Sequence, residues 1–183
     1  ACLCPDPAEP GLISAKAVAK DLNKEGKVAI LHGDLEVGSN AERYNSFIKE
    51  LKNYSGIKIV DEVLIVDNDA DVYAKAKECL NTHKDVQAIF VTNGFPCSVA
   101  RAVEDCGKAG KVQLYAFDTD AEIVSYIKKG IIACTVGQDS FGQGHDPIIW
   151  LYNHIAAEEE FPSDIIHCRV SVIDRSNVDS LII

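Results

Sequence analysis

The sequence predicts an α/β fold with a doubly wound parallel sheet that carries helices on both faces. Two observations support this fold class. Short apolar runs without polar alternation recur along the chain, as at 27–31, and such runs are typical of strands covered on both faces. Helical patterns of about 10 to 15 residues separate these runs, which favours right-handed crossovers between parallel strands. The length of 183 residues suits one main lobe.

The first elements set the alternation. A helix is expected at 12–25, where apolar residues recur at helical spacing, and Gly26 is its expected stop. A strand is expected directly afterwards, at 27–31. The next elements in chain order are a helix at 41–51, a strand within 57–66, a helix at 72–80, a strand at 88–91, a helix at 98–109, a strand at 112–116, a helix at 123–129 and a strand at 131–136.

The last third of the chain adds two elements. A helix is expected at 140–157, with Ser140 and Gln143 as its capping box and an apolar stripe along one side. Pro147 lies inside this helix, which is an unusual position for proline. A final strand is expected at 166–173, where apolar and polar residues alternate as they do in an edge strand with one solvent-facing side.

The charge and hydropathy of the chain exclude several classes of protein. The formal net charge is −10, and the lysines and arginines are scattered, whereas nucleic-acid-binding proteins cluster them. Nucleic acid is therefore not expected to bind this segment. No apolar run approaches the roughly 20 residues needed to cross a bilayer, so the sequence predicts a soluble chain. Because it begins with Ala1 and contains no methionine, the sequence indicates a processed or partial chain.

The cysteines do not indicate a disulfide framework or a metal site. There are 7 of them at irregular spacings, and an odd number cannot pair completely. Cys2 and Cys4 are separated by a single residue, which fits neither the spacing of a redox pair nor that of a zinc knuckle. No metal and no cofactor are expected.

Catalysis is not expected either. None of the 5 histidines stands with a cysteine, a serine or a carboxylate in a recognisable nucleophile arrangement. His32, at the end of the first strand, is the only one well placed for a role in a ligand crevice. The glycine-rich stretch at 137–144 lacks the lysine of a P-loop and the spacing of a dinucleotide fingerprint. The sequence therefore favours a binding protein over an enzyme.

The residues that follow the strands are the candidates for a binding site, because open parallel sheets bind ligands beyond the carboxyl ends of their strands. Arg43 opens the helix that follows the first strand, and Asn93, Asp118 and Gln138 follow later strands, with Phe117 beside Asp118. A guanidinium, two amides, a carboxylate and an aromatic ring are groups that bind vicinal hydroxyls. A polyol is the expected ligand.

Each of these residues also has an ordinary structural interpretation. Arg43 could pair with Glu42 or Asp34 at the surface. Asn93 and Asp118 could be turn or N-cap residues, which are common between a strand and a helix. The recurrence of such residues at four strand ends favours a ligand site over these interpretations.

Four stretches carry a resemblance to a known family. They are 38–47 (GSNAERYNSF), 85–93 (DVQAIFVTN), 116–118 (AFD) and 129–144 (KGIIACTVGQDSFGQG). Together they resemble the second lobe and closing segment of ribose-type and galactose-type sugar-binding proteins of the periplasmic binding protein type I superfamily. The resemblance implies that the second-lobe sugar contacts are Arg43, Asn93, Asp118 and Gln138, that Phe117 stacks on the sugar, and that Asn68 or Asp69 contributes from a loop. The chain departs from the family at Gly94–Phe95–Pro96–Cys97, where the family usually places Asp after the Asn of the preceding strand end.

The resemblance also implies a division of the chain. Residues 1–11 lead into the ligand-binding lobe at 12–138, a helix at 139–164 would pack on the missing first lobe, and 165–183 form the closing strand and tail. Without the first lobe, Trp150, Leu151 and Ile155 are expected to expose apolar area. Surface of that kind tends to find a partner, so we expect the chain to dock on a first lobe or to form a homodimer.

Two functions fit the resemblance. The first is a sugar receptor of an ABC-type uptake system or a chemosensor, which would be periplasmic or extracytoplasmic and would meet a membrane permease or receptor. The second is the effector-binding core of a lactose-repressor-type regulator, which would be cytoplasmic. Unpaired cysteines favour a reducing compartment, whereas the closing stretch at 172–178 is more similar to the transport receptors. We favour the receptor.

Overall fold

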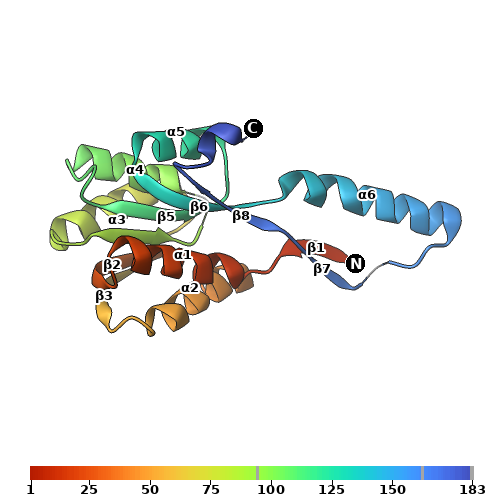
Figure 1. Ribbon diagram of the computed structural model, residues 1–183, viewed down its shortest axis with the longest axis horizontal. Coiled ribbons are helices and arrows are strands. Elements are labelled where there is room, and N and C mark those ends of the chain that lie inside the picture. Colours follow the sequence, from red (N-terminus) through yellow and green to blue (C-terminus); the bar gives the residue numbers. More distant parts are fainter. Residues whose placement is uncertain (94, 162, 182–183) are drawn as a thin grey trace.

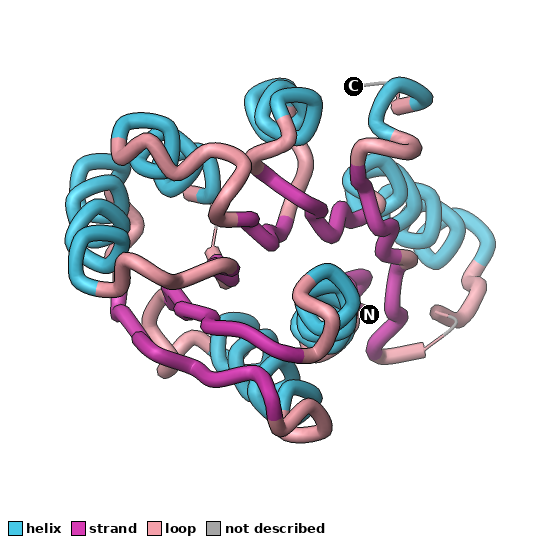
Figure 2. The backbone as a smooth tube through the Cα atoms, turned by 60° about the vertical axis from the view of Figure 1, so that its left-hand side comes forward, coloured by secondary structure: helices cyan, strands magenta, loops and turns pink. Residues whose placement is uncertain are grey.

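The computed structural model describes residues 1–93, 95–161 and 163–181. Its main sheet has the strand order β3–β2–β4–β5–β6–β8, and helices cover both faces (Figure 1 and Figure 2). In chain order the elements are β1 (Cys2–Pro5), α1 (Glu9–Asp21), β2 (Glu25–His32), α2 (Gly38–Leu51), β3 (Gly56–Leu64), α3 (Asp69–Thr82), β4 (Ala88–Val91), α4 (Pro96–Asp105), β5 (Gln113–Phe117), α5 (Ala121–Lys129), β6 (Ile132–Gln138), α6 (Ser140–Ala157), β7 (Ile165–Cys168), β8 (Val170–Asp174) and the short 3₁₀ helix η1 (Val178–Ser180).

Alternate residues of the central strands contribute to two cores, one on each face of the sheet. Ile30 of β2 lies in the core beneath α1 and α2, together with Phe47 and Phe90, whose rings stack with centroids 4.1 Å apart. Its neighbour Leu31 lies in the opposite core, beneath α3, α4 and α5. Because both faces of β2 are buried, its sequence shows no polar alternation. The predicted doubly wound α/β fold is confirmed, and all strand pairs from β3 to β6 are parallel.

Helix α1 differs from its expected range at both ends. It begins at Glu9 rather than at residue 12 and ends before Gly26, the expected stop. Asn23 and Lys24 turn the chain instead, with φ of 51° and 63° in the left-handed region. Gly26 therefore lies inside β2.

Helix α6 spans Ser140–Ala157, as expected, but its cap and the bounds of α4 need correction. Helix α4 ends at Asp105 and not at residue 109, since Gly107 has a φ of 64° and leaves the helical path. The N-cap of α6 is Asp139, whose Oδ1 accepts from the Gly142 amide at 2.8 Å, so the expected capping box is wrong. Pro147 does lie inside α6, as expected.

The final strand is divided into two pieces that belong to different sheets. A break at Arg169 separates β7 from β8. Strand β8 runs antiparallel to β6 at the edge of the main sheet, which confirms the expected edge position. Strand β7 pairs in parallel with β1, in register with Leu3 opposite Ile166. The proline-rich N-terminus was not expected to form a strand, because its hydrogen-bonding partner lies at the far end of the sequence.

Helix α6, β1 and β7 project together from one side of the sheet (Figure 1). We call them the extension. Leu151 and Ile155 of α6 are exposed, as expected. Trp150 is half-buried, and it borders a small hollow together with Leu3 and Phe161. Within the described ranges, no helix is both long and apolar enough to cross a membrane.

Candidate ligand-binding site

The carboxyl ends of β2, β4, β5 and β6 meet at one edge of the sheet, where β6 continues into α6 (Figure 1). We call it the carboxyl edge. Asn93 follows β4, Asp118 follows β5, and Gln138 is the last residue of β6. Arg43 reaches the same edge from α2. The topology thus brings four of the expected site residues to the edge at which such sheets bind ligands.

Arg43 is fixed by a ring and a carbonyl. Its guanidinium carbon lies 3.7 Å from the centroid of the Phe117 ring. Its Nη1 donates to the Thr92 carbonyl oxygen at 2.7 Å. Burial lowers the pKa of Arg43, and the nearby Asp118 carboxylate opposes that shift. Since arginine stays protonated in proteins, the structure holds a positive fork beside a carboxylate, partly shielded from water.

Phe117 does not have the exposure that a stacking role needs. Its side chain is 1% exposed, and the Arg43 guanidinium covers its ring. A ring buried to that degree offers no face to a sugar, so the expected stacking role is not supported by the structure. The contact is a cation–π interaction, and its effect is to orient Arg43.

Asp118 is held by its backbone and by two neighbours. It has a φ of 72°, an uncommon left-handed conformation for a residue other than glycine. Thr135 Oγ1 donates to its carbonyl oxygen at 2.6 Å, and Gln138 Nε2 donates to its Oδ1 at 2.5 Å. Gly137 permits the close approach of the two strands, because a Cβ there would lie 2.4 Å from Thr119 Oγ1. The carboxylate is thus preorganised at the edge.

Asn93 is buried with only half of its amide satisfied. Its side chain is 6% exposed, and Nδ2 donates to Asp67 Oδ1 at 2.8 Å. Among the described residues, Asn93 Oδ1 has no hydrogen-bond partner, and the same holds for Arg43 Nε. Buried polar groups are nearly always paired in proteins, and an unpaired one is costly. Thr119 Oγ1, directly after Asp118, is also unpaired among the described residues, and the three orphan atoms mark this edge as a candidate ligand site.

Asn68 and Asp69 are not directed to this cluster. Asn68 is the N-cap of α3 and accepts from the Asp71 amide at 3.1 Å. Asp69 accepts from Arg101 Nη2 at 2.9 Å and from the Ser98 hydroxyl. Both side chains therefore stabilise α3 and its contact with α4, and the structure does not bring Asn68 together with the other expected residues.

Three residues of the cluster were missed from the sequence. Asp67, one position before Asn68, is the partner of Asn93, and Thr92 supplies the carbonyl for Arg43. Thr92 also accepts from the Gly33 amide through Oγ1 at 3.1 Å. Gln143 donates to Gln138 Oε1 at 3.0 Å. The adjacency of Thr92 to Asn93 and of Asp67 to Asn68, and the position of Gln143 within the stretch 129–144, were the sequence signals that could have identified them.

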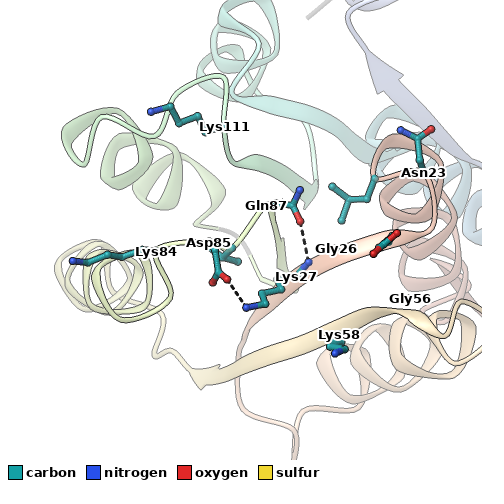
Figure 3. A pocket seen from close by; sticks show the side chains of 12 residues that line it. Asn23, Gly26, Lys27, Gly56, Lys58, Lys84, Asp85, Gln87 and Lys111 are labelled. Atoms are coloured by element: carbon teal, nitrogen blue, oxygen red, sulfur yellow. Dashed lines mark hydrogen bonds and ion pairs between the residues drawn. The ribbon is translucent and has the colours of Figure 1, made fainter.

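A hollow of about 760 Å³ lies at the opposite edge, around the amino ends of β2 and β3 (Figure 3). Lysines border it, but Lys27 is paired with Asp85, and Lys84 and Lys111 extend away from the centre of the view. No buried polar group without a partner is among its lining residues within the described chain. Across all the residues that the structure describes, no group of three or more His, Cys, Asp or Glu could hold a metal ion. The carboxyl edge is therefore the stronger candidate.

A parallel α/β lobe with an oriented guanidinium, a carboxylate and amides at its carboxyl edge is a candidate ligand-binding lobe. Residues 1–159 match the sequence profile of the periplasmic binding protein domain. The chain therefore belongs to the periplasmic binding protein family, which confirms the resemblance.

The relatives of the chain include named sugar-binding proteins. The D-galactose/methyl-galactoside binding periplasmic protein of Haemophilus influenzae is 32% identical over an alignment of 167 residues, and the match covers 82% of this chain and 49% of that protein. An ABC transporter solute-binding protein of Actinobacillus succinogenes with bound D-allose has a TM-score of 0.91 and 26% identity, covering 97% of this chain and 63% of that one. A glucose-galactose binding protein of Geobacillus stearothermophilus has a TM-score of 0.87 and 27% identity, covering 96% and 62%. The chain thus spans about half the length of the curated relative and less than two thirds of these structures.

Proposed function

We propose that this chain forms one half of the sugar-binding cleft of a receptor for an ABC-type uptake system or a chemosensor. The observation that carries the proposal is the cluster of Arg43, Asn93 and Asp118, in which buried polar atoms remain unpaired among the described residues. The relatives of the chain are named as binding proteins, and this supports a function in ligand binding without catalysis.

The atoms left free in the cluster fit a polyol. Asp118 uses Oδ1 for Gln138, so Oδ2 remains for a ligand. Arg43 uses Nη1 for Thr92, so Nη2 remains as a charged donor. Asn93 Oδ1 is a further acceptor, without a partner in the described part of the chain. A sugar with neighbouring hydroxyls can donate to the two acceptors and accept from the guanidinium, and all three are strong or preorganised hydrogen bonds.

The bound ligands of the structural relatives support the same chemical class. Relatives with 26% identity contain D-allose, D-arabinose or D-fucose. These sugars share a run of neighbouring hydroxyls and differ in carbon number, configuration or the group at the last carbon. The chemistry on this half of the cleft therefore supports a pentose-like or hexose-like sugar as a class.

The rest of the cleft would come from another lobe. We propose residues 12–138 as the ligand-binding lobe, 139–164 as the segment that packs on a first lobe, and 165–183 as the closing segment. The exposed apolar side chains Ile148, Leu151 and Ile155 on α6 support such a contact; a second copy of the chain is the other occupant to test. The family and its relatives support an extracytoplasmic location and a permease or receptor as the indirect partner, and they favour a transport receptor over a repressor core.

A thermal-shift series tests the proposal. Ribose, arabinose, xylose, glucose, galactose and allose are added to the chain, to Asp118→Ala and to Asp85→Ala, a matched carboxylate loss at the opposite edge. Binding stabilises the native state by about 0.4 kcal/mol when the sugar concentration equals Kd, which raises Tm by about 1–2 °C for a chain of this size. We expect a concentration-dependent rise with at least one sugar, kept in Asp85→Ala and lost in Asp118→Ala. A rise that survives in Asp118→Ala would contradict the proposed site.

A further inference from the structure

A row of hydrogen-bonded side chains connects Asp118 to the extension. Gln138 Nε2 donates to Asp118 Oδ1 at 2.5 Å, and Gln138 Oε1 accepts from Gln143 Nε2 at 3.0 Å. The same Gln143 nitrogen donates to Cys168 Sγ at 3.4 Å. An amide nitrogen carries two protons, so Gln143 can serve both acceptors at once. We call Gln138, Gln143 and Cys168 the relay.

Each member of the relay comes from a different segment at the base of the extension. Gln138 ends β6, Gln143 lies in the first turn of α6, and Cys168 ends β7 (Figure 1). These segments join the main sheet to the extension, and the relay therefore crosses the boundary between them. A change in the direction of α6 relative to the sheet would move Gln143 away from Gln138 or from Cys168.

The start of α6 is tightly constrained, which gives Gln143 a defined position. The Asp139 side chain accepts from the Gly142 amide at 2.8 Å, and the Gln143 amide donates to the Asp139 carbonyl oxygen at 3.0 Å. A Cβ on Gly142 would lie 2.5 Å from Asp139 Oδ2, so only glycine fits there without movement. Cys168 is buried, and Gln138 and Gln143 are half-buried, so water competes only in part for these bonds.

The relay also determines which atoms of Gln138 a ligand can use. Its Nε2 donates to Asp118 and its Oε1 accepts from Gln143, so both ends of the amide are engaged within the protein. Without Gln143, Oε1 would lose its partner and the amide would be held by Asp118 alone. The Gln138 side chain would then sample other rotamers, and Asp118 Oδ1 would lose part of its hydrogen bonding.

We propose that Gln143 is a positioning residue that holds the Gln138 amide against Asp118 and thereby links the orientation of the extension to the sugar-binding carboxylate. Its link to sugar binding rests on the proposed function. The linkage is reciprocal, because an orientation of α6 that favours the sugar site must in turn be favoured by the sugar. Cys168 anchors the far end of the relay and fixes the Gln143 side chain on the side of β7.

The relay itself is tested without sugar, by the side-chain amide resonances of Gln138 in ¹H–¹⁵N spectra of this chain. Gln143→Leu removes the donor, and Cys168→Ala removes its anchor, whereas Cys168→Ser keeps an acceptor. Asn153→Leu is the matched control, because it removes an amide from the same helix whose one side-chain hydrogen bond, among the described residues, is to Glu159. We expect the pair of Gln138 side-chain amide resonances (the Gln138 pair) to move toward the chemical shifts of a free amide in Gln143→Leu and to move less in Cys168→Ala. In Cys168→Ser and in Asn153→Leu the Gln138 pair should stay in place.

An unchanged Gln138 pair in Gln143→Leu, with the core amides also unchanged, would overturn the proposal. If Gln143→Leu fails to fold, Gln143→Asn replaces it, since a side chain shorter by one methylene cannot reach both acceptors. A shift of the Gln138 pair in Gln143→Asn supports the relay, and its absence overturns it.

A sugar titration of the same variants separates the relay from the proposed function. Loss of one neutral hydrogen bond corresponds to about a fivefold weaker Kd. We expect Gln143→Leu to weaken sugar binding by about that factor and Asn153→Leu to leave it unchanged. Equal affinity in the parent chain and in Gln143→Leu would overturn the role of the relay in binding. If no sugar binds the parent chain but the Gln138 pair still moves in Gln143→Leu, the positioning contact stands and the proposed function fails.

Discussion

The substitution Gly11→Ala tests the packing that positions Arg43. Gly11 lies in the first turns of α1, and a Cβ there would lie 2.1 Å from the Arg43 carbonyl oxygen and 2.2 Å from Ser46 Oγ. Real Cβ contacts essentially never fall below 3.0 Å, so α1 and α2 would have to move apart by almost 1 Å. Overpacking of this kind costs about 1–3 kcal/mol, from which a helix-propensity gain of up to about 1 kcal/mol is subtracted.

The expected net loss for Gly11→Ala is about 0–2 kcal/mol, which lowers Tm by up to about 8 °C in a chain of this length. Gly144→Ala is the control, because the same change in α6 meets nothing within 4 Å. It should gain about 0.8–1 kcal/mol and raise Tm by about 2–4 °C. Thermal unfolding followed by circular dichroism measures both. If Gly11→Ala raises Tm as Gly144→Ala does, the close contact of α1 with α2, and hence the placement of Arg43, is wrong.

Three further predictions concern other parts of the chain. Asn68→Ala should cost about 1 kcal/mol in unfolding measurements, because it removes the N-cap of α3, and it should leave sugar binding unchanged. Burial raises the pKa of Cys134 to about 12, so a thiol reagent in mildly alkaline buffer should label exposed Cys2 quickly and Cys134 only on unfolding; equal labelling rates in mass spectrometry would contradict the buried position. Hydrogen bonds from the Ser98 hydroxyl and from Arg101 lower the pKa of Asp69 in the folded chain. The ionised Asp69 side chain therefore stabilises the fold above the pKa that it has in the unfolded chain, and this stabilisation is lost as the pH falls through the pKa of the folded state. Acid unfolding curves of Asp69→Asn should lack this loss.

The fold could be predicted from the sequence because burial on two faces leaves a direct pattern. Strand β4, for example, has four buried residues in a row, so its sequence is continuously apolar. Such a run is not mistaken for an amphipathic helix or strand, in which polar residues recur. The edge at which a site forms then follows from topology alone. For this reason the sequence alone assigns Arg43, Asn93, Asp118 and Gln138 to one edge.

The errors arose where distant segments decide the local structure. Strand β1 depends on β7, and Cys2 lies opposite Ile165, a pairing that no short-range pattern indicates. The role of Phe117 depends on Arg43, which comes from another element and covers its ring. Gln143 has the spacing of a capping residue, yet its side chain bonds to Gln138 because Asp139 already caps the helix.

In the loop after β3, the sequence does not determine which of two adjacent polar residues faces the candidate site. Asn68 and Asp67 are neighbours and both are polar, so composition does not distinguish them. The backbone turns between them, and Asn68 caps α3 while Asp67 contacts Asn93. A shift of one residue therefore separates a structural role from a place in the candidate site.

Chemical-shift mapping with sugar tests the central claim most directly. The backbone amides of Asn93, Asp118 and Gln138 report on the carboxyl edge, and those of Lys27 and Gln87 report on the opposite edge. Titration with the same sugar panel detects weak binding as a saturable change in peak position. The account predicts saturable shifts at the carboxyl edge with at least one sugar and none at the opposite edge. Shifts confined to the opposite edge, or no saturable shift with any sugar, would contradict it.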